Sequence, residues 1–474
     1  MAFYYIIITV QQRGNCGAVM ASSLKNHFIP AFFTVLLAVG AFYLFKALLP
    51  DRLFAEAAVQ SDKVVVDSMM LLAVAESQAE AVVLTVEEAP DTVQAAEEVR
   101  PPGLGRFFEK LFALEKTKTG AVRIAYFGDS MIEGDLIVQD IRRNYQRKYG
   151  GQGVGFVPLS SMSPHLGISV KYEYSPGWAT YSFLKKAPVP VGVNGYVSIA
   201  RDSSSWTRYR AGSSPLMRPT LFYGWSGNGD ASVRVTINDE PSASIKLQPN
   251  RVLNKISLAQ SAGSLTLQFV NADSIPFYGV NFAGRGGVNI DNFASRGNSG
   301  LPLSTFSERL MNAFHQELRY DLIVLQYGTN VLNSKSMAYE WYAVRMTNVV
   351  NHLRKCFPGA DILVVSVADR ATKYETEMKT DSATFPLIRA QKKYAGNTGS
   401  MFVNLFKLMG GEGTMVKWVN ADPPMAVTDY THFNSKGSKR IADLIFGELE
   451  REYENFKIQN NLSVDDGEGG GPDE

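Results

Sequence analysis

Short apolar runs alternate with helical patterns between residues 105 and 457, and few folds are compatible with that order. The apolar runs have the length of buried strands and cover Val122–Phe127, Asp321–Gln326, Ile362–Val367 and Met401–Leu405. Helical spacing of apolar residues is found at Leu136–Tyr149, Met337–Cys356, Pro386–Tyr394 and Lys436–Glu452. Parallel strands need crossover connections, which are usually helices. We therefore predict an α/β domain whose parallel sheet is covered by helices on both faces.

Residues 165–283 interrupt this alternation. Runs with a period of two residues, separated by turn signals such as Asn228-Gly229-Asp230, cover Ile168–Tyr174, Tyr196–Ala200, Thr220–Trp225, Val233–Asn238, Ser244–Leu247, Lys255–Leu258 and Leu265–Val270. No helical pattern intervenes, which is typical of a β-sandwich or jelly roll. Because the α/β pattern resumes afterwards, we predict that this module is inserted into an α/β domain formed by residues 105–164 and 284–457.

An uncharged run near the start of the chain predicts a membrane anchor over residues 28–49. Its 18 residues from Phe28 to Phe45 are just long enough for a bilayer core at about 1.5 Å per residue. A cleaved signal peptide is the alternative, because Ala55–Ala57 resembles a cleavage site. Positive charges flank the run almost equally, whether translation begins at Met1 or at Met20, so the flanks leave the orientation open.

The flanking segments differ in composition from the folded part. Residues 51–103, rich in Ala, Val and Glu, are expected to form an acidic, partly helical stalk or linker, and residues 458–474 a disordered acidic tail.

Residues 101–457 carry 41 basic and 30 acidic residues, although the whole chain has a net charge of only +1. An anionic polymer is compatible with this excess, as is a generally soluble surface. No nucleic-acid-binding motif is present, so we expect no nucleic-acid partner.

Four polar segments lie at predicted strand ends or helix starts. Gly128-Asp129-Ser130 follows the first strand, and residues 294–300 form a loop with Gly297 and Gly300 just after the insert. Gly328-Thr329-Asn330 follows the strand that ends at Gln326, and Asp429-Tyr430-Thr431-His432 precedes the last helix. In an open α/β sheet, the carboxyl ends of the strands form the ligand-binding edge. Gly151–Phe156 is rich in glycine but follows a helix, so we interpret it as a plain turn.

These four segments, in this order, resemble the blocks of the SGNH/GDSL hydrolase superfamily, and the resemblance covers residues 105–457. It implies a flavodoxin-like parallel sheet and a serine esterase that needs no cofactor and no metal. Ser130 would be the nucleophile, His432 its general base, and Asp429 the group that orients the imidazole. The N–H groups of Ser130 and Gly297 and the side-chain amide of Asn330 would hold the oxyanion.

The other histidines are weaker candidates for the base. The chain has five. His27 lies beside the membrane run, His315 and His352 fall within helical patterns, and His165 has no carboxylate predicted near it. We also expect Asp129 to hydrogen-bond its own turn without taking part in proton transfer. The N–H of Ser130 is expected to lie at the positive end of the first helix, where an oxyanion would be favoured.

Within the superfamily, the layout resembles bacterial cell-surface O-acetylesterases that act on peptidoglycan and carry a carbohydrate-binding-like insert between the serine and glycine blocks. The resemblance implies an acetylated polysaccharide, peptidoglycan above all, as the substrate. Together with the anchor predicted at residues 28–49, this expected substrate predicts an inner-membrane protein with its catalytic domain on the periplasmic side. Met131, where several relatives carry His or Leu, departs from the pattern. A polysaccharide O-acetyltransferase with the same triad and a non-catalytic wall-binding protein are the alternatives.

Overall fold

The computed structural model describes residues 32–34, 36–37, 67–83, 103–161, 169–202, 205–212, 215–333 and 337–462. Most of the predicted anchor at residues 28–49 lies outside them, and its five described residues are helical. None of the helices within the described ranges is both long enough and apolar enough to span a bilayer. Residues 463–474 of the predicted tail, and all of the predicted stalk except residue 103 and the segment at 67–83, also lie outside the described residues.

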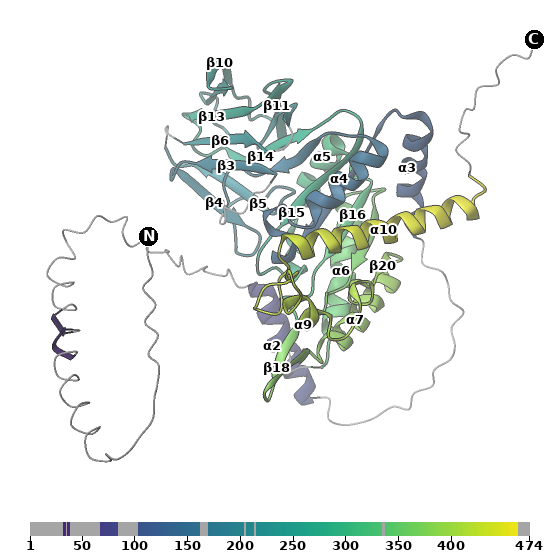
Figure 1. Ribbon diagram of the computed structural model, residues 1–474. Coiled ribbons are helices and arrows are strands. Elements are labelled where there is room, and N and C mark those ends of the chain that lie inside the picture. Colours follow the sequence, from purple (N-terminus) through teal and green to yellow (C-terminus); the bar gives the residue numbers. More distant parts are fainter. Residues whose placement is uncertain are drawn as a thin grey trace, which may run out of the picture. The chain divides into compact units, whose positions relative to one another are not determined.

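A parallel five-stranded sheet forms the centre of the α/β domain, as predicted (Figure 1). The strands lie in the order β15-β1-β16-β17-β20, and each pairs in parallel with its neighbours. Their bounds are β1 (Ala121–Gly128), β15 (Gly287–Ala294), β16 (Leu322–Gln326), β17 (Asp361–Val365) and β20 (Met401–Val403). The three strands β15, β1 and β16 are adjacent, so the segments that follow them emerge at the same edge of the sheet.

Helices cover both faces of this sheet because each buries an apolar stripe against it. One core contains residues of α3 (Gly105–Thr117), α4 (Val138–Tyr149) and α10 (Ser435–Gln459). The opposite core contains residues of α5 (Glu308–Leu318), α6 (Glu340–Cys356) and α7 (Thr384–Asn397). Shorter elements complete the domain: η2 (Ser130–Asp135), η4 (Leu301–Thr305), α8 (Leu405–Met409), α9 (Thr414–Val419), and the hairpin of β18 (Ala371–Tyr374) with β19 (Glu377–Thr380).

Strand β15 is an edge strand of the parallel sheet that the apolar pattern did not predict. Its sequence contains Asp291, which is fully buried and would ordinarily argue against a buried strand. The carboxylate of Asp291 is satisfied by the guanidinium of Arg123 on β1, at 2.8 and 2.9 Å, and by the hydroxyl of Tyr320 at 2.6 Å. Arg123 and Asp291 are far apart in the sequence and pair only in the folded protein. The strand could therefore not be recognised from its own residues.

The insert consists of antiparallel sheets. Five strands lie in the order β10-β9-β13-β6-β3, and a sheet with the order β11-β8-β14-β5-β4 packs against them over a shared apolar core. Their bounds are β3 (Val170–Tyr174), β4 (Trp178–Ser182), β5 (Tyr196–Ala200), β6 (Trp206–Ala211), β8 (Thr220–Gly224), β9 (Ser232–Ile237), β10 (Glu240–Lys246), β11 (Leu253–Ser257), β13 (Ser264–Val270) and β14 (Pro276–Ala283). Two short strands, β7 (Leu216–Met217) and β12 (Ser261–Ala262), form a separate pair.

The interpretation of Gly151–Phe156 as a plain turn was wrong. Residues Gly153–Val157 form strand β2, which pairs antiparallel with β14 of the insert. Gly153 has a φ of +90°, and a Cβ atom there would lie 1.9 Å from the carbonyl oxygen of Phe282. The glycines therefore allow a close backbone approach between the two strands.

Strand β2 also fastens the insert to the α/β domain. The amide N–H of Phe156 donates to Asp291 on β15 at 2.9 Å. The Phe156 ring packs against Phe222 of the insert and against Phe293 and Phe314 of the α/β domain, with centroids 5.7, 6.2 and 6.0 Å apart. Aromatic pairs at these separations contribute about 0.5–1.5 kcal/mol each beyond the burial of their surface. The junction is thus packed as a continuous core.

Candidate active site

The nucleophile candidate Ser130 lies at a sharp turn at the end of β1. Asp129 caps this turn, since its Oδ1 accepts from the N–H of Met131 at 2.9 Å, as predicted. A Cβ atom on Gly128 would lie 2.9 Å from Ile132 Cδ1 and 3.0 Å from the Gln326 carbonyl oxygen, so the strand end has no space for a side chain. The sequence therefore positions Ser130 through a glycine before the turn and a cap within it.

The predicted contribution of a helix dipole at Ser130 needs correction. Ser130 opens the six-residue 3-10 helix η2, which is interrupted by non-helical backbone at Glu133 and Gly134, and the α-helix begins only at Val138. The peptide dipoles of such a short, kinked element do not align into a substantial macrodipole. Any stabilisation of negative charge at this position has to come from individual N–H groups.

His432 and Asp429 reach Ser130 from the loop before α10. The Nε2 atom of His432 lies 2.8 Å from Ser130 Oγ, and its Nδ1 atom lies 2.7 Å from Asp429 Oδ2. Asp429 Oδ1 also accepts from the backbone N–H groups of Thr431 and His432, at 2.9 and 3.0 Å. The structure thus brings together the three residues that the sequence proposed, in the order serine, histidine, carboxylate.

The loop that carries His432 is held by the start of α10. Asn434 caps this helix by accepting from the N–H groups of Lys436 and Gly437. A Cβ atom on Gly437 would lie 1.9 Å from the carbonyl oxygen of Met425, so only glycine lets the helix start pack against that chain segment. The same carbonyl accepts from Asn434 N–H at 3.2 Å, which closes the loop around residues 425–434.

The pKa values of the two carboxylates near Ser130 are shifted in opposite directions. Burial alone would raise the pKa of Asp429, but the hydrogen bonds from His432 and Thr431 lower it below its usual range. Asp129 is almost fully buried, and this burial raises its pKa to about 6 although the Met131 N–H and the nearby His432 oppose the shift. Asp429 is therefore ionised wherever His432 is used as a base, which suits a carboxylate that stabilises an imidazolium.

The two remaining candidates, Gly297 and Asn330, are joined through one loop. Ser295 N–H donates to the carbonyl of Gly128 at 3.0 Å, so residues 295–300 begin directly beside the turn of Ser130. Gly297 has a φ of +81°, in the left-handed region that favours glycine. The Asn330 side chain is half-buried and donates to the Asn298 carbonyl at 3.1 Å, which leaves its second amide hydrogen for another acceptor.

Sequence reasoning missed the residues that brace this loop. Arg296 pairs with Glu133 of η2 at 2.7 Å. Asp67, which the sequence assigned to the stalk, is only 2% exposed, and its Oδ2 accepts from the N–H of Ser299 at 3.0 Å and from its hydroxyl. Its Oδ1 caps helix α2 (Ser68–Val83) by accepting from Met69 and Met70 N–H. An Asp before an apolar helical run is a capping signal, but nothing local indicates that it contacts Ser299.

The other two histidines in the described part of the chain differ from His432. His315 and His352 each donate a ring N–H to a backbone carbonyl, that of Pro358 and that of Phe306 respectively. His352 also has Glu308 Oε1 at 3.5 Å from Nδ1 and Cys356 Sγ at 3.5 Å from Nε2. His27 and His165 lie outside the described residues. Within the described part of the chain, no cluster of three or more His, Cys, Asp or Glu side chains could hold a metal ion. Met131 is buried in the core of the α/β domain and so belongs to the packing beneath the turn.

Comparison with known proteins agrees with this fold. A structure of a peptidoglycan O-acetylesterase superimposes with a TM-score of 0.62 and 19% sequence identity, over 74% of this chain and 97% of the other. A family two carbohydrate esterase from Cellvibrio japonicus aligns with a TM-score of 0.24 and 11% identity, over 61% of this chain and 99% of the other. No family model matches the sequence, and no curated protein matches it either. The chain therefore shares the fold of that peptidoglycan O-acetylesterase structure, an α/β domain with a parallel sheet and an inserted antiparallel β-module.

Proposed function

We propose that this protein is a serine esterase that removes O-acetyl groups from a cell-envelope polysaccharide, with peptidoglycan as the substrate. The observation that carries the proposal is the continuous hydrogen-bonded line from Ser130 Oγ through His432 to Asp429, at 2.8 and 2.7 Å. A serine hydroxyl is a weak nucleophile until a neighbouring base removes its proton, and this line supplies that base in an oriented form.

The reaction follows from the positions of these groups. His432 Nε2 takes the proton of Ser130 Oγ as the oxygen attacks the acetyl carbonyl carbon, and Asp429 stabilises the resulting imidazolium. The N–H groups of Ser130 and Gly297 and the free amide hydrogen of Asn330 hold the oxyanion, where each such donor contributes about 2.7–4 kcal/mol. The imidazolium then protonates the departing sugar oxygen and leaves an acetyl group on Ser130. Water, deprotonated by His432, releases acetate and restores the hydroxyl.

Hydrolysis is favoured over transfer of the acetyl group to another sugar because the base is accessible to solvent. The side chains of His432 and Asp429 are 35% and 46% exposed. A transferase has to keep water away from its acyl-enzyme. An open base admits water to that intermediate.

The test is the replacement Ser130→Ala, assayed for acetate release from acetylated peptidoglycan, acetylated xylan and a chromogenic acetate. Triad losses usually exceed about 10³-fold. We expect no measurable acetate release from any substrate that the unmodified protein cleaves, together with a nearly unchanged melting temperature, since the replacement removes only one half-buried hydroxyl. Activity above about a tenth of the original would show that Ser130 is not the nucleophile.

We also propose that residues 28–49 anchor the protein in the inner membrane as a single span, with the esterase on the periplasmic side. The uncharged run supports the anchor, and the substrate of the proposed reaction supports the orientation. The protein should sediment with membranes, and removal of residues 1–50 should release it. Added protease should cleave the domain in spheroplasts but not in intact cells. A freely soluble full-length protein, or a domain that spheroplasts protect, would contradict this topology.

A further inference from the structure

The outer face of the five-stranded sheet β10-β9-β13-β6-β3 carries a concentration of positive charge. Alternate residues of these strands point into the core of the insert, and the others face solvent. Basic residues on the solvent side are Lys171, Arg208, Arg210, Arg234 and Lys246, whereas Glu173 is the one acid at the outward positions of these described strands. We refer to this set of basic residues as the basic face.

The strand register places these side chains in rows across the sheet. Lys171 lies opposite Arg210, so two like charges are cross-strand neighbours. Such pairs destabilise a sheet when nothing lies between them. Glu173 pairs with Arg210 at 3.6 Å, but both side chains are more than half exposed, and the pair adds little stability. The arrangement leaves a net positive surface that an anion would neutralise.

A second row supplies groups suited to a sugar. Trp206 lies opposite Gln268, which in turn lies opposite Arg234 on the next strand. Trp206 is half-buried. Arg208 donates to Thr266 Oγ1 at 3.0 Å, so the guanidinium is held close to the sheet. An aromatic residue, an amide and a guanidinium therefore occupy paired positions in this row, and Arg208 is held nearby.

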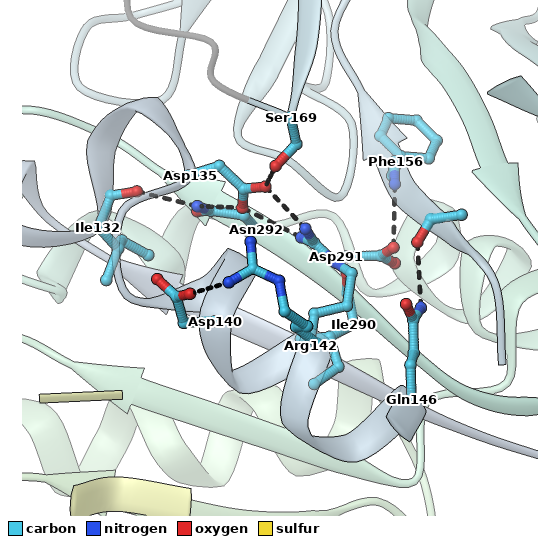
Figure 2. A network of polar contacts seen from close by, with 12 residues as sticks. Ile132, Asp135, Asp140, Arg142, Gln146, Phe156, Ser169, Ile290, Asp291 and Asn292 are labelled. Carbon is cyan, nitrogen blue, oxygen red and sulfur yellow. Dashed lines mark hydrogen bonds and ion pairs between the residues drawn. The ribbon is translucent and has the colours of Figure 1, made fainter. Parts of the chain in front are cut away.

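The basic face begins next to the candidate active site. Ser169, the residue before β3, donates its hydroxyl to Asp135, the last residue of the helix η2 that starts at Ser130 (Figure 2). Asp135 is also held by Arg142 at 2.7 and 3.0 Å and by Asn292 at 3.1 Å. Lys171 follows two residues after Ser169, which is roughly 7 Å along a strand. The end of the basic face at Lys171 is therefore linked to the short helix that begins at Ser130.

We propose that the basic face binds the carboxylate groups of the glycan strand whose ester lies at Ser130. This inference rests on the proposed esterase function and adds to it a preference for carboxylate-bearing glycans over neutral ones. Guanidinium groups bind carboxylates through two parallel hydrogen bonds, which suits Arg208, Arg210 and Arg234. The Trp206 ring offers a surface for the apolar side of a sugar ring. An anionic membrane surface is a poorer fit, because the face lacks fully exposed large apolar side chains to enter a bilayer.

The test compares two triple variants that lose the same charge. The first carries Arg208→Gln, Arg210→Gln and Arg234→Gln. The control carries Lys185→Gln, Lys186→Gln and Arg251→Gln, which are exposed bases of the same insert outside this face. Acetate release is measured from acetylated peptidoglycan, acetylated xylan and a chromogenic acetate. Binding to peptidoglycan sacculi and to anionic lipid vesicles is measured by co-sedimentation in the Ser130→Ala background, so that it does not depend on turnover.

We expect kcat/KM on peptidoglycan to fall about tenfold in the first variant, and sacculus binding to weaken in parallel, since three exposed ionic contacts are lost. The difference should shrink at about 1 M salt, where the screening length is only about 3 Å. Activity on the chromogenic acetate should stay within about twofold of the original, because the acyl-transfer groups are untouched. The control variant should behave like the unmodified protein.

Three outcomes would overturn the inference. Equal losses in the two triple variants would mean that only net charge matters. An equal loss on acetylated xylan would remove the preference for carboxylates, and weakened vesicle binding with unchanged sacculus binding would identify a membrane contact instead. None of these outcomes bears on the nucleophile, because failure of the esterase proposal would appear as acetate release that survives Ser130→Ala.

Discussion

Two carboxylates with opposite environments flank the serine turn. Asp429 is partly exposed and accepts three hydrogen bonds from its own loop, which favours its ionised form. Asp129 is buried and has a pKa of about 6, so part of the population is protonated in weakly acidic conditions. When burial and hydrogen bonds shift the pKa values of two carboxylates near a nucleophile in opposite directions, the carboxylate that stays ionised suits the orienting role. The buried carboxylate suits the structural role.

The raised pKa of Asp129 predicts a pH-dependent cost to stability. The unfolded chain ionises near 3.8 and the folded chain near 6, so the free energy of unfolding falls as pH rises between these values and stays lower above them. Asp129→Asn keeps an oxygen that can accept from Met131 and removes the titration. We expect this variant to be more stable than the unmodified protein at pH 8, by on the order of 3 kcal/mol, and the difference to become small toward pH 4.

Denaturant unfolding between pH 4 and pH 8 measures this effect, with Asp239→Asn in an exposed turn as the matched control. If the difference in the free energy of unfolding between the variant and the unmodified protein is the same at every pH, ionisation of Asp129 does not destabilise the folded state. The control variant should show no rise in relative stability over the same range.

At the scale of elements, helix α2 contacts the loop that carries Gly297. Asp67 links the two, since one carboxylate oxygen caps the helix and the other holds Ser299. Glu76, on the same helix, pairs with Arg345 of α6. Tyr342 of α6 donates to the Ser299 carbonyl at 2.8 Å, so the loop is fixed from two directions. The segment that sequence composition assigned to a stalk therefore contributes to the packing around the site.

The replacement Asp67→Ala tests this positioning role. Its loss leaves the buried N–H and hydroxyl of Ser299 without an acceptor, which costs about 1–3 kcal/mol, and removes a helix cap worth about 1 kcal/mol. We expect kcat on a chromogenic acetate to fall about tenfold or more with KM little changed, because the role proposed for Gly297 is to hold the oxyanion and not to bind the ester.

Asp67→Asn, which retains one acceptor, should recover part of kcat, and Glu76→Ala is the control on the same helix. A lower melting temperature with unaltered kcat in Asp67→Ala would assign Asp67 a purely structural role.

For the molecule as a whole, the features that could be predicted from the sequence are those that depend on local residue patterns. The strands β1, β16 and β17 were recognisable because they are continuous apolar runs, and three of the four polar segments follow strands of one parallel sheet, β1, β15 and β16. The contacts between Ser130, His432 and Asp429 were expected from the family resemblance, although their catalytic roles stay predictions. Features that depend on distant partners were missed. Strand β15 depends on Arg123, which neutralises the buried Asp291, and strand β2 depends on its close contact with β14. The buried position of Asp67 depends on its hydrogen bonds with Ser299.

The packed junction at Phe156 has a consequence for the proposed action on a polymer. Because β2 pairs with β14 and its Phe156 ring and amide are fixed to the α/β domain, the insert cannot swing relative to Ser130 without breaking a shared core. If the proposed function and the proposed role of the basic face both hold, a glycan bound by the insert would be presented at one fixed distance from Ser130. The ester that is cleaved would then be selected by its distance from the charged groups already bound, and acetyl groups would be removed at a regular interval along the strand.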